Sequence, residues 1–290
     1  MTFIALALVV ASAFAHATWN YLAKSSRDTY AFTWAFTSVS TLLYLPIATA
    51  VAWFHPPPVT ALGFIAVTVG LHILYFWFLN AGYTRSDLSI VYPVARGTGI
   101  ILIPIGAVVV LGEHVTAAAA VSIGVVIVGV LTVHSRGTGR AALRGLVHSL
   151  QDPGSRFALM TGVIIAGYSL WDKNALSHLS PIVLDTGIFA GQALINAPYA
   201  LNRRRPAVLR EIRERPIAVI AAGILSPLAY LLVLTALTFS QVAYVAPTRE
   251  IGIVVGTLIG ARTLKEPYPA NRLVGSFLIV LGVFGLALSP

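Results

Sequence analysis

Two arginines and a lysine stand inside long apolar stretches of this sequence, where charged side chains are rare. Arg96 and Arg249 each lie several residues from the nearest end of an apolar stretch, and Lys173 follows Trp171 and Asp172. A charge at the centre of a bilayer costs about 2.5–3.5 kcal/mol on insertion scales, so we expect these side chains to face the protein interior and to have partners. Because a guanidinium binds oxyanions through two parallel hydrogen bonds, the arginines favour a carboxylate, phosphate or phosphonate ligand.

Polar and aromatic residues recur at helical spacing near these cations. His16 and Asn20 are four residues apart and share a helix face, and Tyr168 and Asp172 repeat this spacing in the second half. Tyr92 lies about one turn before Arg96 in the sequence. The predicted binding site consists of Arg96, Arg249, Tyr92, His16, Asn20, Trp171, Asp172 and Tyr75.

A structural role for the charged residues is an open alternative. Glu250 follows Arg249 directly, but adjacent helical residues point about 100° apart, so each is expected to pair across the bundle. The candidates for ion pairing or for coupling to an ion are Glu250, Asp172 and Lys173. Burial disfavours the ionised form of a carboxylate, whereas a nearby cation favours it, and the balance decides whether the group titrates near neutral pH. Transport coupled to protons and exchange of one solute for another are therefore both open.

The elements that position these residues are predicted to be membrane-spanning helices. The 290 residues are 57% hydrophobic and 10% charged, with a mean hydropathy of +0.85. Soluble domains carry about 25% charged residues, so a soluble enzyme, a disordered chain and a coiled coil are excluded. A span needs about 20 apolar residues, and ten are predicted, at 2–24, 30–54, 59–82, 87–111, 115–134, 157–177, 181–201, 217–239, 242–262 and 268–289.

The formal net charge of +9 follows from membrane topology. Sixteen of the 19 Lys and Arg residues lie in loops that follow odd-numbered segments. Lys and Arg accumulate on the cytoplasmic side of a membrane. We therefore predict a protein of the inner (cytoplasmic) membrane whose odd-numbered loops face the cytoplasm and whose two termini lie on the opposite side. The expected partners are a small-molecule substrate and the lipid bilayer, with no nucleic acid, and the chain is expected to be a monomer or a homodimer.

The two halves of the sequence resemble each other. A shift of 153 residues places Arg96 on Arg249 and Gly129 on Gly282. Five helices per half give the halves opposite orientations, which is typical of secondary transporters that bind substrate between the repeats. The predicted units are a first repeat at 1–135, a basic cytoplasmic linker at 136–156 that could hold a short interfacial helix, and a second repeat at 157–290.

Prolines and glycines give these helices further features. Pro93 and Pro247 lie close to the two arginines, and proline interrupts the helix hydrogen bonds, so we predict local bending there and a possible gate. Small residues allow close helix contact. The fifth and tenth segments are therefore expected to pack or dimerise, through Gly124, Gly129, Gly275 and Gly282.

The arrangement resembles the EamA-type transporters of the drug/metabolite transporter superfamily. The resemblance lies in the five-plus-five segments, in the stretch from Ala15 to Asn20, and in Leu111-Gly112-Glu113 after the fourth segment, which Leu264-Lys265-Glu266 repeats. It covers essentially the whole chain. It implies that helices 1, 3, 4, 6, 8 and 9 surround a central cavity and that the protein moves a small organic solute.

The predicted fold is therefore an all-α membrane protein of ten transmembrane helices in two inverted five-helix repeats. The predicted function is secondary transport, by alternating access, of a small organic solute bearing an anionic group. One alternative is an exporter of cationic or amphiphilic compounds, which Glu250 and Asp172 would recognise, and another is a non-transporting membrane partner protein. The sequence lacks cysteine, a P-loop and an H-E-x-x-H pattern, so no cofactor, metal or enzymatic activity is expected.

Overall fold

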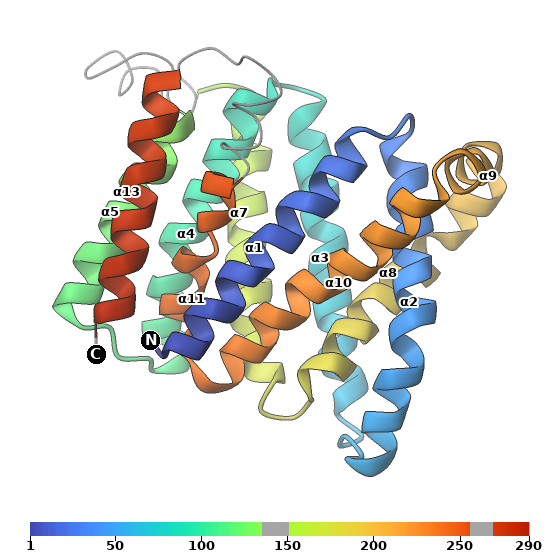
Figure 1. The fold of residues 1–290 in the computed structure, drawn as a ribbon, viewed down its shortest axis with the longest axis horizontal. Coiled ribbons are helices and arrows are strands. Elements are labelled where there is room, and N and C mark those ends of the chain that lie inside the picture. The colour runs from blue at the N-terminus through green and yellow to red at the C-terminus, as the bar shows by residue number, and fades with distance from the viewer. Residues whose placement is uncertain (135–150, 256–268, 290) are drawn as a thin grey trace.

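The computed structural model describes residues 1–134, 151–255 and 269–289, which form a bundle of helices (Figure 1). Within these ranges the helices are α1 (Phe3–Lys24), α2 (Thr29–Phe54), α3 (Ala61–Tyr83), α4 (Leu88–Leu111), α5 (Ala117–His134), α7 (Ser155–Ala175), α8 (Pro181–Asn202), α9 (Arg205–Glu214), α10 (Pro216–Phe239), α11 (Val242–Thr248) and α13 (Pro269–Leu288). The described residues contain no strand. The predicted all-helical fold is confirmed.

The helix boundaries follow the apolar stretches of the sequence. Nine of the ten predicted segments match an observed helix to within two residues at each end, and the segment predicted at 242–262 is interrupted after Thr248. Seven described helices are long and apolar enough to cross a membrane: α1, α2, α3, α4, α5, α10 and α13. The helices α7 and α8 have 21 and 22 residues and are not among the seven; they contain the acidic residues Asp172 and Asp185.

The two halves of the chain interleave within one bundle. Helix α1 packs on α10 and α3 packs on α7, while α2 packs on α8 and α5 packs on α13. Under the predicted repeat, α1–α5 of the first half correspond in order to α7, α8, α10, α11 and α13 of the second half. Replacing each helix by its counterpart turns the pair α1–α10 into α7–α3, and it turns the pairs α2–α8 and α5–α13 into themselves. In Figure 1 α1 begins at the lower end of the bundle and α7 at the upper end, so the two helices run in opposite directions.

The contact between α5 and α13 repeats itself at the offset of 153 residues found in the sequence. A Cβ atom added at Gly129 would lie 2.8 Å from the backbone nitrogen of Ile279, and one added at Gly282 would lie 2.9 Å from that of Val126. Gly282 and Ile279 are the positions 153 residues after Gly129 and Val126. The predicted close packing is confirmed at these glycines, but it is wrong at Gly124, because a Cβ there would meet nothing within 4 Å.

A short helix occupies the arginine-rich stretch that the sequence predicts as a loop. Helix α9 begins with Pro206 in its first turn, a position that proline favours. Its buried Glu211 accepts hydrogen bonds through Oε1 from the backbone N–H groups of Arg27 at 3.0 Å and Asp28 at 2.9 Å. The connection between α1 and α2 is therefore tied to α9 at one end of the bundle.

Candidate solute-binding site

The ninth predicted segment is broken at its two charged residues. Helix α11 ends at Thr248, and residues 251–255 are helical again. Between them Glu250 N–H donates to the Pro247 carbonyl at 3.1 Å and Gly252 N–H donates to the Arg249 carbonyl at 3.0 Å, a tighter spacing than in an α-helix. The predicted bend near Pro247 is thus a local break, and it carries Arg249 and Glu250.

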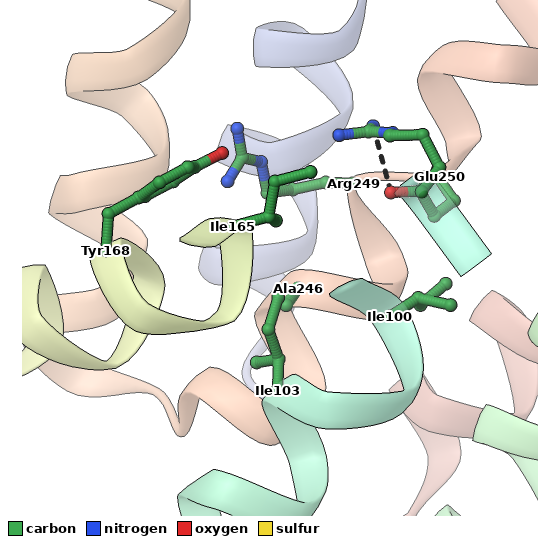
Figure 2. Close-up of a pocket in the computed structure, with 8 residues that line it drawn as sticks. Ile100, Ile103, Ile165, Tyr168, Ala246, Arg249 and Glu250 are labelled. Carbon is green, nitrogen blue, oxygen red and sulfur yellow. Dashed lines mark ion pairs between the residues drawn. The ribbon is translucent and has the colours of Figure 1, made fainter. Parts of the chain in front are cut away.

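A small cavity lies beside this break, between α4, α7 and α11 (Figure 2). It is lined by Arg96, Ile100, Ile103, Ile165, Tyr168, Ala246, Arg249 and Glu250. Its volume of about 20 Å³ is enough for one water molecule. In this conformation the cavity is too small for an organic solute.

One of the two arginines is paired in this conformation. Arg96 Nη2 lies 2.9 Å from Glu250 Oε1, and the Glu250 side chain is only 6% exposed. Glu250 therefore pairs across the bundle, as predicted, and not with its neighbour Arg249. Two other polar atoms of the pair, Arg96 Nε and Glu250 Oε2, are buried without a hydrogen-bond partner among the described residues.

The other arginine has a different environment. Among the residues that the structure describes, no carboxylate lies within salt-bridge distance of Arg249. Its guanidinium carbon lies 5.5 Å from the ring centre of Tyr230, and in Figure 2 the hydroxyl of Tyr168 points toward it. Tyrosine rings and hydroxyls stabilise a cation but do not neutralise it. Arg249 therefore presents a positive charge at the edge of the cavity.

Asp172 is fully buried and contacts Tyr230, the residue whose ring lies near Arg249. Its Oδ1 accepts a hydrogen bond from Thr68 Oγ1 and its Oδ2 accepts one from the Tyr230 hydroxyl, both at 2.5 Å. Both oxygens are satisfied, and Arg249 lies within electrostatic reach of the carboxylate. Tyr230 thus links Asp172 to Arg249.

Lys173 does not take the ion-pairing role that the sequence suggests. Its Nζ donates to the carbonyls of Leu237 at 2.6 Å and Ser240 at 2.9 Å. These carbonyls belong to the C-terminal end of α10, where unpaired carbonyl groups attract a cation. Lys173 therefore caps α10, and it makes no salt bridge with a described carboxylate.

The structure brings six of the eight predicted binding residues into one region. His16 lies within electrostatic reach of both arginines, and Tyr75 and Tyr92 lie within reach of Arg96. The six are Arg96, Arg249, Asp172, His16, Tyr75 and Tyr92.

The other two predicted residues are engaged elsewhere. Asn20 Nδ2 donates to the His16 carbonyl of its own helix at 2.7 Å, and Trp171 Nε1 donates to the Phe64 carbonyl on α3 at 3.1 Å. The predicted set omits Tyr168, although its place four residues before Asp172 puts the two on one helix face.

The Leu111-Gly112-Glu113 motif connects the end of α4 to the start of α11, the helix that ends next to the site. Gly112 ends α4 with a left-handed backbone, φ +68°, which glycine adopts without strain. The two carboxylate oxygens of Glu113 accept the backbone N–H groups of Val242 at 2.8 Å and Ala243 at 2.9 Å, so they cap the N-terminus of α11. The corresponding Glu266 lies outside the described residues, and so does most of the linker at 136–156 for which the sequence predicts a short helix.

Comparisons with known proteins agree with this architecture. A solved structure titled "Crystal structure of protein" superposes with a TM-score of 0.74 at 16% identity, over 98% of this chain and 96% of that chain. At this identity the likeness shows the fold alone. None of the curated proteins matches the chain significantly in sequence.

The second half of the chain matches a known sequence family. The model of the EamA-like transporter family matches residues 153–288, which nearly coincide with the predicted second repeat. Together with the apolar helices, this match makes the protein a multi-pass membrane protein. The second half of the chain therefore matches the EamA-like transporters, which supports the predicted resemblance to the drug/metabolite transporter superfamily.

Proposed function

We propose that this transporter moves a small organic solute bearing a carboxylate, phosphate or phosphonate group, and that Arg249 binds that group. The observation that carries the proposal is the difference between the two matched arginines. Glu250 neutralises Arg96, whereas Arg249 faces the cavity with no described carboxylate in salt-bridge distance. A guanidinium in this setting is suited to an oxyanion.

The break at Arg249 and Glu250 supports alternating access around this site. Discontinuous helices at the interface of two inverted repeats are where secondary transporters bind their substrates. In the proposed cycle the cavity of about 20 Å³ belongs to a closed conformation. Rocking of the two halves would open it to one side of the membrane at a time.

A cationic solute is the second candidate, and one observation favours it. Glu250 Oε2 is buried without a partner among the described residues, so it could accept a hydrogen bond from an ammonium group. The first proposal is preferred because the other oxygen of this carboxylate is already held by Arg96.

The thermal stability of the purified full chain distinguishes the two. Phenylphosphonate and benzoate test the anion, and phenyltrimethylammonium is a cation of similar shape. We expect the two anions to raise the melting temperature of the wild type and of Arg156→Gln, an exposed residue at the start of α7, but not that of Arg249→Gln. Stabilisation by the cation alone would overturn the proposal in favour of the second candidate, and stabilisation by lipids alone would favour a non-transporting partner protein.

A further inference from the structure

Asp185 is a buried acidic residue that the solute site does not use. It lies one turn into α8, and the structure leaves it 0% exposed. Neither carboxylate oxygen has a hydrogen-bond partner among the described residues, and no described cation forms a salt bridge with it. The hydroxyl of the adjacent Thr186, 3% exposed, is also without a partner.

An ionised carboxylate is not stable in such a place. Transfer of an unpaired charge into an apolar interior costs so much that the group becomes neutral instead. The described residues contain no group of three metal-ligating side chains that could hold a metal ion there. The neutral form that remains is the protonated carboxylic acid.

The groups around Asp185 also favour the neutral form. On α7 the carboxylate of Asp172 lies within electrostatic reach, and on α2 so does the phenol of Tyr44, whose hydroxyl donates to the Ile224 carbonyl at 3.0 Å. On α3 and α10 the titratable groups His72 and Tyr230 face Asp172.

Of the two carboxylates, Asp172 is the one suited to ionisation. Two hydroxyls donate to Asp172 and none of the described donors reaches Asp185. Since two neighbouring carboxylates repel each other when both are ionised, the proton is expected on Asp185.

We propose that Asp185 is a proton-binding site of this transporter, and that its proton is bound and released together with the anionic solute at Arg249. The path between the two sites runs through Asp172 and Tyr230. Arg249 lies within electrostatic reach of Asp172, and Asp172 lies within reach of Asp185.

The sign of this coupling follows from charge. An oxyanion bound to Arg249 cancels the positive charge that compensates Asp172, so a further negative charge on Asp185 becomes less favourable. Anion binding therefore favours the protonated form of Asp185, and by linkage a proton on Asp185 favours anion binding. Solute and proton would then cross in the same direction. This coupling step rests on the proposed function, whereas the protonation of Asp185 does not.

Infrared difference spectroscopy tests the protonation without any solute. The full chain in lipid nanodiscs is compared between neutral and alkaline pH, where ordinary exposed carboxylates are already ionised. A buried protonated carboxyl that ionises in this range gives a C=O stretching band. We expect the wild type to show this band, Asp185→Asn to lack it, and Asp185→Glu to show it at a shifted frequency. The matched control Asp87→Asn, an exposed N-cap residue of α4 whose side chain makes no capping bond, should keep it.

Several outcomes would overturn the proposal. One is an unchanged band in Asp185→Asn, and another is the absence of a band in the wild type. A third is stabilisation of the wild type at alkaline pH by sodium chloride and not by choline chloride, which would assign the site to sodium. If Asp185→Asn fails to fold, the band of the wild type and its shift in Asp185→Glu still decide the assignment.

The coupling is tested separately with phenylphosphonate as the probe. We expect the ratio of its apparent Kd in the wild type to that in Asp185→Asn to rise about tenfold per pH unit above the pH at which the band disappears. The ratio removes the contribution of the phosphonate's own ionisation near neutral pH. A band without this pH dependence would retain the proton site and overturn the coupling. Failure of phenylphosphonate to bind at any pH would contradict the proposed function while leaving the infrared result intact.

Discussion

Arg96 and Arg249 occupy matched positions in the two halves of the sequence but have different partners. Glu250 follows Arg249 in the second half of the chain, but its carboxylate pairs with Arg96 in the first half. The first half has Gly97 at the position that corresponds to Glu250, so no second carboxylate completes the symmetry there. This asymmetry leaves Arg249 without a described carboxylate in salt-bridge distance, which is the basis for proposing that it binds the solute.

Substitution of Glu250 tests this division of roles at the level of single residues. In Glu250→Gln the Arg96 charge loses its neutralising partner, so we expect a lower melting temperature without ligand, because a buried charge is left uncompensated. The same variant should bind phenylphosphonate about tenfold more tightly, equivalent to about 1.4 kcal/mol, because two cations then face the cavity.

The matched control for this prediction is an exposed ion pair. Arg27 and Glu214 are 3.0 Å apart with side chains 65% and 44% exposed. Since surface pairs contribute about 0–1 kcal/mol, Glu214→Gln should change neither the melting temperature nor the affinity. Unchanged or weaker phenylphosphonate binding in Glu250→Gln would contradict the division of roles.

At the scale of elements, the break in the ninth segment is held from both sides. Glu113 fixes the N-terminus of α11, and the cross-bundle pair of Glu250 with Arg96 fixes the residues after its C-terminus. The side chains at the break are thus anchored to α4 and to the turn that follows it. Movement of α4 relative to α7 would change the cavity between them.

The pair α5–α13 is an element whose packing can be tested with a matched pair of glycines. Gly129→Ala places a Cβ atom 2.8 Å from the Ile279 backbone nitrogen, and the two backbones would have to separate. We expect a loss of about 1–3 kcal/mol, seen as a lower melting temperature. Gly124→Ala on the same helix meets nothing within 4 Å and should be at least as stable as the wild type. Equal losses in the two variants would contradict the described packing.

Much of this element structure could be predicted from the sequence, because a bilayer demands about 20 apolar residues per span. Helix α9 could not, since its arginines and its single buried glutamate resemble a solvated loop. Pro247 predicts a bend near Arg249, but not that the helix ends there. That Glu250 pairs with Arg96 could not be predicted, because the distance between them across the bundle does not follow from their spacing in the sequence. Asp185 has no sequence signature, because the proposal for it rests on its lack of hydrogen-bond partners among the described residues.

At the scale of the whole molecule, helices of the two halves pack against each other, and both halves line the small cavity described above. Each half contributes cavity residues: Arg96, Ile100 and Ile103 from the first, and the remaining five from the second. The cavity is closed here, and its walls belong to different halves. The placement of the basic loops on the cytoplasmic side stays a prediction from the positive-inside rule.

Solute flux through the reconstituted protein tests the central claim most directly. The full chain, Arg249→Gln and the control Arg156→Gln are inserted into proteoliposomes, and counterflow of labelled phenylphosphonate is measured at equal protein density. A hydrogen-bonded charge contributes about 1.5–3 kcal/mol, so the account predicts flux about 10- to 100-fold slower in Arg249→Gln at limiting solute, with wild-type flux in the control. Wild-type flux in a normally inserted Arg249→Gln protein would contradict it.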